Sequence, residues 1–262
     1  MRVAWLTDIH LDFLDPAARA GLAATVRAEQ PDTVVVTGDI AIAPTVLDLI
    51  EQLAAGCGAP LHYVLGNHDY YRGSIADVRA RAAATTAGRS RWLHAGGVVR
   101  LDATTALVGV DGWGDARLGN FVTTRVMLND FIFIEELSGI SRGALRERLE
   151  AYGDESATRL RALLAEALAW AEHVVVATHV PPFREACWHE GAISNDDWLP
   201  FFTCKATGDV LRETFAAHPR ARATVLCGHT HSSGQADLLP NLRVLTGAAE
   251  YGAPRIQQVI EL

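Results

Sequence analysis

Short hydrophobic runs rich in β-branched residues alternate along the chain with alanine-rich segments of helical period. The runs predict strands at residues 3–7, 33–37, 61–65, 98–101, 106–110, 173–178, 223–227, 243–246 and 256–260. The intervening segments predict helices at residues 16–30, 44–55, 74–87, 141–172 and 207–217. Because Gly153 lies in the middle of the 141–172 segment, we expect two helices or one interrupted helix there. The alternation of strands and helices indicates an α/β fold with layered sheets.

Two stretches between the predicted elements are long and irregular, at residues 111–137 and 180–204. Connections of this length without secondary structure are uncommon in compact domains and often act as lids or binding loops. No repeat and no low-complexity tract divides the chain. We therefore expect a single domain over residues 1–262, in which both loops cover a substrate.

The composition, with 49% hydrophobic and 21% charged residues, is that of a globular protein. No apolar run approaches the roughly 18 residues that span a bilayer, so we expect no membrane span and no signal peptide. The four cysteines are scattered without a CxxC pair, which favours reduced thiols in a cytoplasmic protein. The formal charge of −8 disfavours duplex nucleic acid as a partner, since binding it requires lysines and arginines against phosphates. A small phosphorylated substrate in a locally positive site stays compatible with this charge, and the sequence does not predict an oligomeric state.

Polar residues that can bind metals follow the carboxyl ends of five predicted strands. In chain order they are Asp8 and His10, then Asp39, then Asn67, His68 and Asp69, then His179, and finally His229 and His231. In α/β sheets this edge is where ligands bind. Each of the shorter motifs alone is more often a turn or a hydrogen-bonded structural residue. GHTH is a stronger signal, because two imidazoles one residue apart at a turn can converge on a metal. The joint occurrence of these motifs at strand ends indicates a metal site.

The other five histidines lie outside these motifs. His62 and His173 fall inside predicted strands, and we expect structural roles for both. His94 and His218 are expected at the surface. His189 lies in the second irregular stretch, and the sequence leaves its role open.

The ordered motifs DxH, GD, GNHD, a later histidine and GHxH resemble the calcineurin-like metallophosphoesterase superfamily, over residues 8–231. The resemblance implies a four-layer α/β/β/α sandwich, in which two mixed sheets are flanked by helices. It also implies a metal-dependent hydrolase of phosphate esters. Residues 42 and 43 are Ile and Ala, which departs from the GDxxDRG pattern of Ser/Thr protein phosphatases and from the GDxxY tyrosine of purple acid phosphatases. The remaining group includes cyclic-nucleotide phosphodiesterases, nucleotide and sugar-nucleotide hydrolases, and nucleases.

Carried over by position, the resemblance assigns three residues to each of two metal ions and one residue to both. The first ion takes Asp8, His10 and His231, the second takes Asn67, His179 and His229, and Asp39 bridges them. Two such ions, about 3.5–4 Å apart with a shared hydroxide, can clamp the attacking and leaving oxygens of an in-line displacement. Mixed nitrogen and oxygen ligands suit Mn, Fe or Zn without choosing among them. Two divalent ions against the carboxylates of Asp8 and Asp39 leave a positive charge for a phosphoryl group.

The resemblance places His68 outside the metal shell, near the leaving-group oxygen, where it can donate a proton. Asp69 would then hold that ring and raise its basicity. The leading interpretation is a phosphodiesterase that acts on a small or nucleotide-like substrate. A phosphomonoesterase, a nuclease and a non-catalytic interaction module stay open as alternatives.

Residues of the two irregular loops should choose the substrate. The aromatic candidates are Trp188, Trp198, Phe201 and Phe202. They either stack on a base or an apolar leaving group, or pack the loop onto the body. The candidates for a phosphate fork are Arg117, Arg125 and Arg184, although an arginine at such a position is more often an ordinary surface charge.

Overall fold

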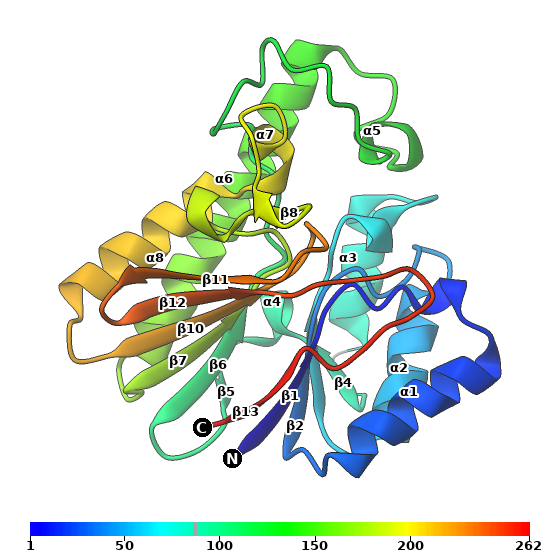
Figure 1. The fold of residues 1–262 in the computed structure, drawn as a ribbon, viewed down its shortest axis with the longest axis vertical. Helices are drawn as coiled ribbons and strands as arrows, with labels where there is room; N and C mark the ends of the chain where they lie inside the picture. Colours follow the sequence, from blue (N-terminus) through cyan, green and yellow to red (C-terminus); the bar gives the residue numbers. More distant parts are fainter. Residues whose placement is uncertain (86–87) are drawn as a thin grey trace.

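The computed structural model describes residues 1–85 and 88–262, and in it two β-sheets pack face to face (Figure 1). The first sheet has the order β13 (Gln258–Glu261), β1 (Arg2–Leu6), β2 (Thr33–Thr37), β3 (Leu61–Val64) and β4 (Ser90–Trp92). The second has the order β11 (Gly234–Leu239), β12 (Leu242–Thr246), β10 (Arg222–Cys227), β7 (His173–Ala177), β6 (Thr105–Gly109) and β5 (Val99–Arg100). Both sheets are mixed, because β13, β11 and β5 are antiparallel to their neighbours at the sheet edges while the other pairings are parallel.

Helices cover the outer face of each sheet. The first sheet is covered by α1 (Pro16–Ala28), α2 (Val46–Cys57) and α3 (Ile75–Ala84), and the second by α6 (Arg142–Ala167) and α8 (Lys205–Ala217). Shorter elements lie in the connections: α4 (Leu93–Gly96), α5 (Asp130–Phe133), α7 (Leu199–Phe202), η1 (Leu11–Phe13), η2 (His68–Tyr70), η3 (Arg184–Ala186) and the hairpin of β8 (Trp188–His189) and β9 (Ala192–Ile193). The predicted four-layer α/β/β/α sandwich is therefore confirmed.

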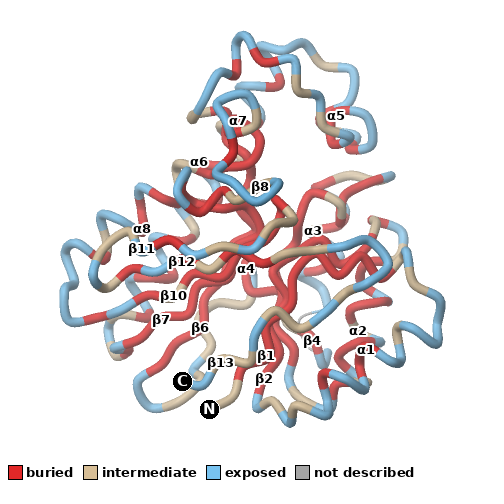
Figure 2. The backbone as a smooth tube through the Cα atoms, viewed as in Figure 1, coloured by how far each residue is buried: buried red, intermediate tan, exposed pale blue. Residues whose placement is uncertain are grey.

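Successive side chains of the central strands point to opposite faces of the sheet, which gives each sheet one core on either side. In β1, Val3 and Trp5 point between the sheets and pack in one core with Val175 of β7. Ala4 and Leu6 point the other way, into the core beneath the helices. Strands covered on both faces are buried along their whole length, as the continuous red of the central strands shows in Figure 2. The parallel strands are thus rigid supports for the loops at their carboxyl ends.

The predicted strands are all present, each with ends within two residues of the expected ones. The hydrophobic pattern does not reveal β4, which is only three residues long, or β11, an edge strand whose sequence GQADLL has few apolar residues. The two-residue strands β8 and β9 lie in the stretch 180–204, which was expected to be irregular. The helix expected at 74–87 ends at Ala84, and residues 86–87 lie outside the described part of the chain.

The expected break in the 141–172 segment is wrong, because α6 runs unbroken through Gly153. The glycine is there for close packing. A Cβ at this position would lie 2.6 Å from the Cβ of Asp115, in the loop that crosses the helix. The helix thus tolerates a residue of low helix propensity where only a hydrogen fits.

The expectation that His94 lies at the surface is also wrong. His94 is buried and stacks on Trp92, with ring centroids 5.2 Å apart. His62 and His173 are buried in strands, as expected, and His218 is exposed. The four cysteines are unpaired and buried. Among the described helices, none is long and apolar enough to cross a membrane.

We expect Gly143→Ala and Gly153→Ala, both in α6, to change stability in opposite directions. Alanine favours a helix over glycine by about 0.5–1 kcal/mol. A Cβ at Gly143 meets nothing within 4 Å, so that substitution should raise the free energy of unfolding. Gly153→Ala should lower it by about 1–3 kcal/mol, because the added methyl collides with Asp115. Urea denaturation of both variants measures this, and a stabilised Gly153→Ala would contradict the tight packing.

Candidate metal centre

The candidate metal ligands lie where β1, β2, β3, β7 and β10 end, at the edge beneath α5 and α7 in Figure 1. Five of the seven have an unusual backbone conformation, whereas Asn67 lies in the right-handed helical region. Of the nine described non-glycine residues with positive φ, five are Asp8, His10, Asp39, His229 and His231. Such left-handed residues are strained by about 1 kcal/mol or more each, and they cluster at functional sites. The tight turns aim these side chains across the strand ends toward one another.

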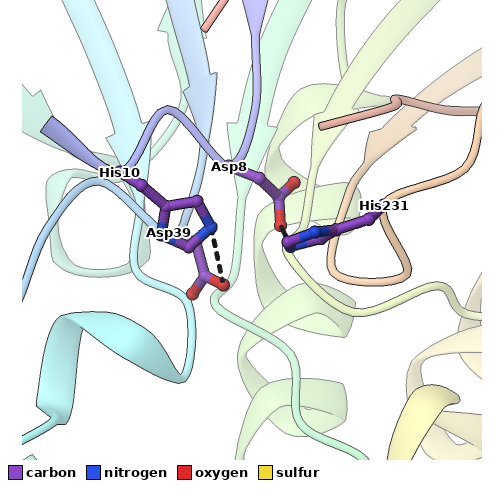
Figure 3. A group of neighbouring side chains, drawn as sticks. All are labelled: Asp8, His10, Asp39 and His231. Atoms are coloured by element: carbon purple, nitrogen blue, oxygen red, sulfur yellow. Dashed lines mark ion pairs between the residues drawn. The ribbon is translucent and has the colours of Figure 1, made fainter. Parts of the chain in front are cut away.

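Asp8, His10, Asp39 and His231 form the first cluster, in which one ligand atom of each lies within 4.8 Å of the others (Figure 3). His231 Nε2 is 3.5 Å from Asp8 Oδ1, and His10 Nε2 is 4.0 Å from Asp39 Oδ2. Neither ring nitrogen of His10 has a hydrogen-bond partner among the described residues, although the ring is buried. A buried imidazole without polar partners fits a metal ligand.

The electrostatics of the first cluster also fit a cation. Burial lowers the pKa of His10 to about 4, so its ring is neutral and available as a ligand. Burial, and then the charges of Asp8 and Asp69, raise the pKa of Asp39 well above its usual range. Burial alone would also raise the pKa of Asp8, but the hydrogen bond from His231 and the neighbouring imidazoles lower it below its usual range. Carboxylates buried this closely together repel one another unless a cation lies between them.

A second cluster brings together atoms that can only accept hydrogen bonds. His179 Nδ1 lies 2.8 Å from the carbonyl of Thr37 and donates to it, which leaves Nε2 with a lone pair. His229 Nε2 donates in the same way to the carbonyl of Phe201, at 3.1 Å, which leaves Nδ1 with a lone pair. These two free nitrogens are 3.2 Å apart and lie 3.1 and 2.9 Å from Asn67 Oδ1. Three lone pairs at contact distance fit a bound cation.

The amide of Asn67 is oriented by a residue that the sequence analysis missed. Asn67 Nδ2 donates to Asp130 Oδ1 at 2.8 Å, so its oxygen must face the two imidazoles. Asp130 also accepts a 2.7 Å bond from the hydroxyl of Tyr71 and is buried. It begins α5, inside the first irregular stretch, and no motif distinguishes it from other loop acids. Asp39 joins the two clusters, since its Oδ1 lies 3.3 Å from His179 Nε2.

The structure brings His68 to the site but corrects the expected role of Asp69. His68 stacks on Tyr71, with centroids 4.2 Å apart, and its Nε2 lies 3.9 Å from Asp39 Oδ2. Asp69 accepts hydrogen bonds from the backbone amides of Ile40, Ala41 and Gly66 with its two carboxylate oxygens. Its carboxylate therefore ties the GD loop to the GNHD loop and does not orient the His68 ring.

Two glycines of the motifs are required by space. A Cβ at Gly66 would overlap Asp39 Oδ1 and lie 2.7 Å from His179 Nε2. A Cβ at Gly228 would overlap Asp8 Oδ2. These glycines let the backbone approach the ligand side chains closely, which explains the G of GNHD and of GHxH.

A cavity of about 280 Å³ opens over the two clusters. Its lining includes Asp39, Asn67, His68, His229 and His231 on the floor. Its walls are Tyr71, Met127, Leu128, Asn129, Asp130, His189, Phe202, Thr230 and Tyr251. The segment that carries Tyr251, between β12 and β13, was not among the loops expected near the site.

The loop residues named from sequence divide between the two expected roles. Phe202 lines the cavity and packs edge-on against His229, at 5.0 Å between centroids, and Trp198 stacks behind it. Phe201 is buried, and its backbone carbonyl accepts the hydrogen bond from His229 Nε2. His189 also lines the cavity, and its Nδ1 bonds the carbonyl of Thr230.

The candidate arginines and Trp188 are absent from the described lining of the cavity. Arg117 pairs with Asp115 and Asp154, and Arg184 pairs with Asp196. Both guanidinium groups are therefore in ion pairs with aspartates that do not line the cavity.

Comparison with known proteins agrees with this geometry. The family model of the calcineurin-like phosphoesterases matches residues 1–233, so the chain belongs to this family and is a metallophosphoesterase with a metal-binding cluster. No curated protein sequence matches the chain.

Several solved structures share the fold at low sequence identity. Phosphopantetheinyl hydrolase from Mycobacterium tuberculosis is 17% identical, with a TM-score of 0.66 over 95% of this chain and 89% of that one. A dimetal phosphatase from Danio rerio is 15% identical, with a TM-score of 0.59 over 95% of this chain and 87% of that one. The protein TT1561 of Thermus thermophilus is 13% identical, with a TM-score of 0.52 over 94% of this chain and 88% of that one.

We expect Asp130→Ala to weaken metal binding although Asp130 is not itself a ligand. Without its acceptor, the Asn67 amide is free to rotate its oxygen away from the imidazoles. The loss should be about 10–100-fold in affinity for one of two ions, as for other residues that orient a ligand. Titration with Mn followed by metal analysis measures it, with Asp48→Ala, at an exposed acid of α2, as control. Asp130→Asn, which keeps an acceptor oxygen, should retain most of the affinity. Unchanged binding by Asp130→Ala would contradict the orienting role.

Proposed function

We propose that the protein is a dinuclear metal-dependent phosphodiesterase that acts on a small phosphorylated substrate. The observation that supports this most strongly is the second cluster, in which Asn67, His179 and His229 present only acceptor atoms to one point. Asp39 lies between this point and the cluster of Asp8, His10 and His231, so two ions would share its carboxylate. When bound, two such ions activate a water and stabilise the charge of a phosphoryl group.

The chain's own residues divide the remaining work of the reaction. Thr37 and Phe201 hold the two imidazoles in the tautomers that a metal requires. Burial, and then the neighbouring imidazoles, lower the pKa of His68 to about 2, so a proton on this ring needs the negative charge of a bound phosphate. We propose that His68, stacked on Tyr71 in the cavity, gives that proton to the leaving oxygen.

Charge favours a diester over a monoester. The net charge expected for the site balanced two divalent ions against the carboxylates of Asp8 and Asp39. Asp130 also lines the cavity and adds a third carboxyl group. Burial raises the pKa of Asp130, and in its ionised form this third acid removes one further positive charge from the site. A diester carries one negative charge and a monoester near neutral pH carries up to two, so the diester matches the reduced charge better.

The alternatives have less support. A nuclease needs a cationic track for the backbone of its substrate, and the described residues that line the cavity include no lysine or arginine. A non-catalytic module has no need of the seven ligand positions, all of which are filled. The imidazole and carboxylate donors support Mn, Fe or Zn as the ions. The four buried, unpaired thiols support a reducing compartment such as the cytoplasm.

We expect the Mn-loaded protein to hydrolyse bis(p-nitrophenyl) phosphate faster than p-nitrophenyl phosphate, and Asp39→Asn to hydrolyse neither. The asparagine keeps the shape of Asp39 but removes the charge that two ions would share. Release of p-nitrophenolate is the measurement, with metal content determined in parallel. A preference for the monoester would overturn the proposed diester chemistry. No turnover of either ester by fully metal-loaded protein would overturn the proposed activity.

We expect His68→Ala to lose about 100-fold or more of kcat while it keeps its metal ions, because His68 is a proton donor and not a ligand. The loss should depend on the leaving group. The loss should be large for a methyl or ethyl phosphodiester, because an alkoxide needs a proton to leave. It should be small for a p-nitrophenyl phosphodiester, because p-nitrophenolate leaves without a proton. Turnover of the alkyl ester at the wild-type rate would remove His68 from the mechanism.

A further inference from the structure

The walls above the metal ligands are apolar on two sides. Tyr251 lies over the first cluster, with its ring centroid 4.5 Å from that of His10 and 5.2 Å from that of His231. Met127 and Leu128 line the cavity beside the second cluster, next to Asp130 in sequence. The polar floor that would hold a phosphoryl group is thus continuous with hydrophobic surface.

Of the seven large hydrophobic side chains exposed among the described residues, two line the cavity and two more pack on residues of its walls. The large hydrophobic side chains that the structure leaves exposed are Phe13, Val122, Met127, Ile132, Phe133, Ile193 and Tyr251. Met127 is 66% exposed and Tyr251 is 48% exposed, and both line the cavity. Phe13 packs on Tyr251 at 5.0 Å between centroids, and Phe133 packs on Tyr71, another wall residue, at 5.6 Å. Exposed apolar side chains gathered at a cavity mouth are typical of a ligand site.

The charges around the cavity point in the same direction. The charged side chains in its described lining are the acids Asp39 and Asp130, besides the histidines, and no lysine or arginine accompanies them. A second phosphate or a carboxylate on the substrate would therefore meet no cationic side chain there, and Asp130 would repel it. A polyphosphate, a nucleoside diphosphate or a sugar acid does not suit these walls.

We infer that the group esterified to the phosphate is an uncharged, apolar or aromatic group, held between Tyr251 on one wall and Met127 with Phe202 on the other. This inference rests on the proposed function, because the phosphoryl group must lie on the metal-binding floor. The cavity of about 280 Å³ is near the lower end of typical small-molecule sites, so it encloses a small group and leaves a longer one to emerge past Met127 and Tyr251.

Binding of two matched phosphonates tests this inference independently of turnover. The probes are the methyl esters of hexylphosphonate and of 5-sulfopentylphosphonate, which have similar length and differ in the terminal charge. Calorimetry with the Mn-loaded protein should show the hexyl compound binding about 10-fold or more tightly, since its chain leaves water for the apolar walls. Equal affinity, or preference for the sulfonate, would overturn the inference.

Substitutions in the cavity walls test which side chains cause the preference for the hexyl compound. Met127→Gln and Tyr251→Ala should each reduce the preference for the hexyl compound several-fold without loss of metal. Val122→Gln is the matched control, because Val122 is exposed in the same loop but does not line the cavity. A preference that survives both wall variants would contradict the assignment of these side chains.

The same samples are assayed with bis(p-nitrophenyl) phosphate, which separates the two proposals. Turnover with no preference between the phosphonates would retain the phosphodiesterase and reject the apolar specificity. A clear preference for the hexyl compound without turnover would support the apolar site and reject the phosphodiesterase.

Discussion

Repulsion between lone pairs is the physical constraint on which the site depends. His179 Nε2 alone has three other acceptor atoms within 3.3 Å, on Asn67, His229 and Asp39. No hydrogen lies between them, because the carbonyls of Thr37 and Phe201 and the carboxylate of Asp130 take the hydrogens on the outer side. Without a cation this arrangement is unfavourable, and with one it is a preformed set of ligands. The ligands therefore depend on the residues that turn their hydrogens outward.

The two-sheet sandwich makes such an arrangement possible. The central strands are buried on both faces, so their carboxyl ends are held in place by the cores between and outside the sheets. Ligand residues follow these ends at once, and five of the seven are in left-handed conformations that would not persist in a loose loop. Asp69 adds a further connection, since its carboxylate binds backbone amides of both the GD and the GNHD loops. The packing of the strands in these cores thus offsets the strain of the turns.

The loops above the strand ends contribute residues to the candidate metal centre as well as to the walls of the cavity. Asp130 from the first loop orients Asn67, and Phe201 from the second fixes the tautomer of His229. Both loops also furnish cavity walls, through Met127 and Phe202. Movement of either loop would therefore alter metal binding and specificity together. The protein has no separation between a rigid catalytic floor and an independent lid.

The sequence by itself determined nine strands, their alternation with helices and the polar motifs at their ends, because runs of β-branched residues and short motifs are local properties of the chain. The seven candidate ligands followed from the family resemblance that those motifs carry. The single-domain organisation stays a prediction. Local patterns could not reveal that Gly153 lies in an unbroken helix, since the reason is a distant neighbour, Asp115. Nor could they show that Asp69 binds backbone amides, that Asp130 orients Asn67 or that Tyr251 covers His10. Each of these depends on a contact between segments distant in sequence, and only the tertiary structure decides which distant segments meet.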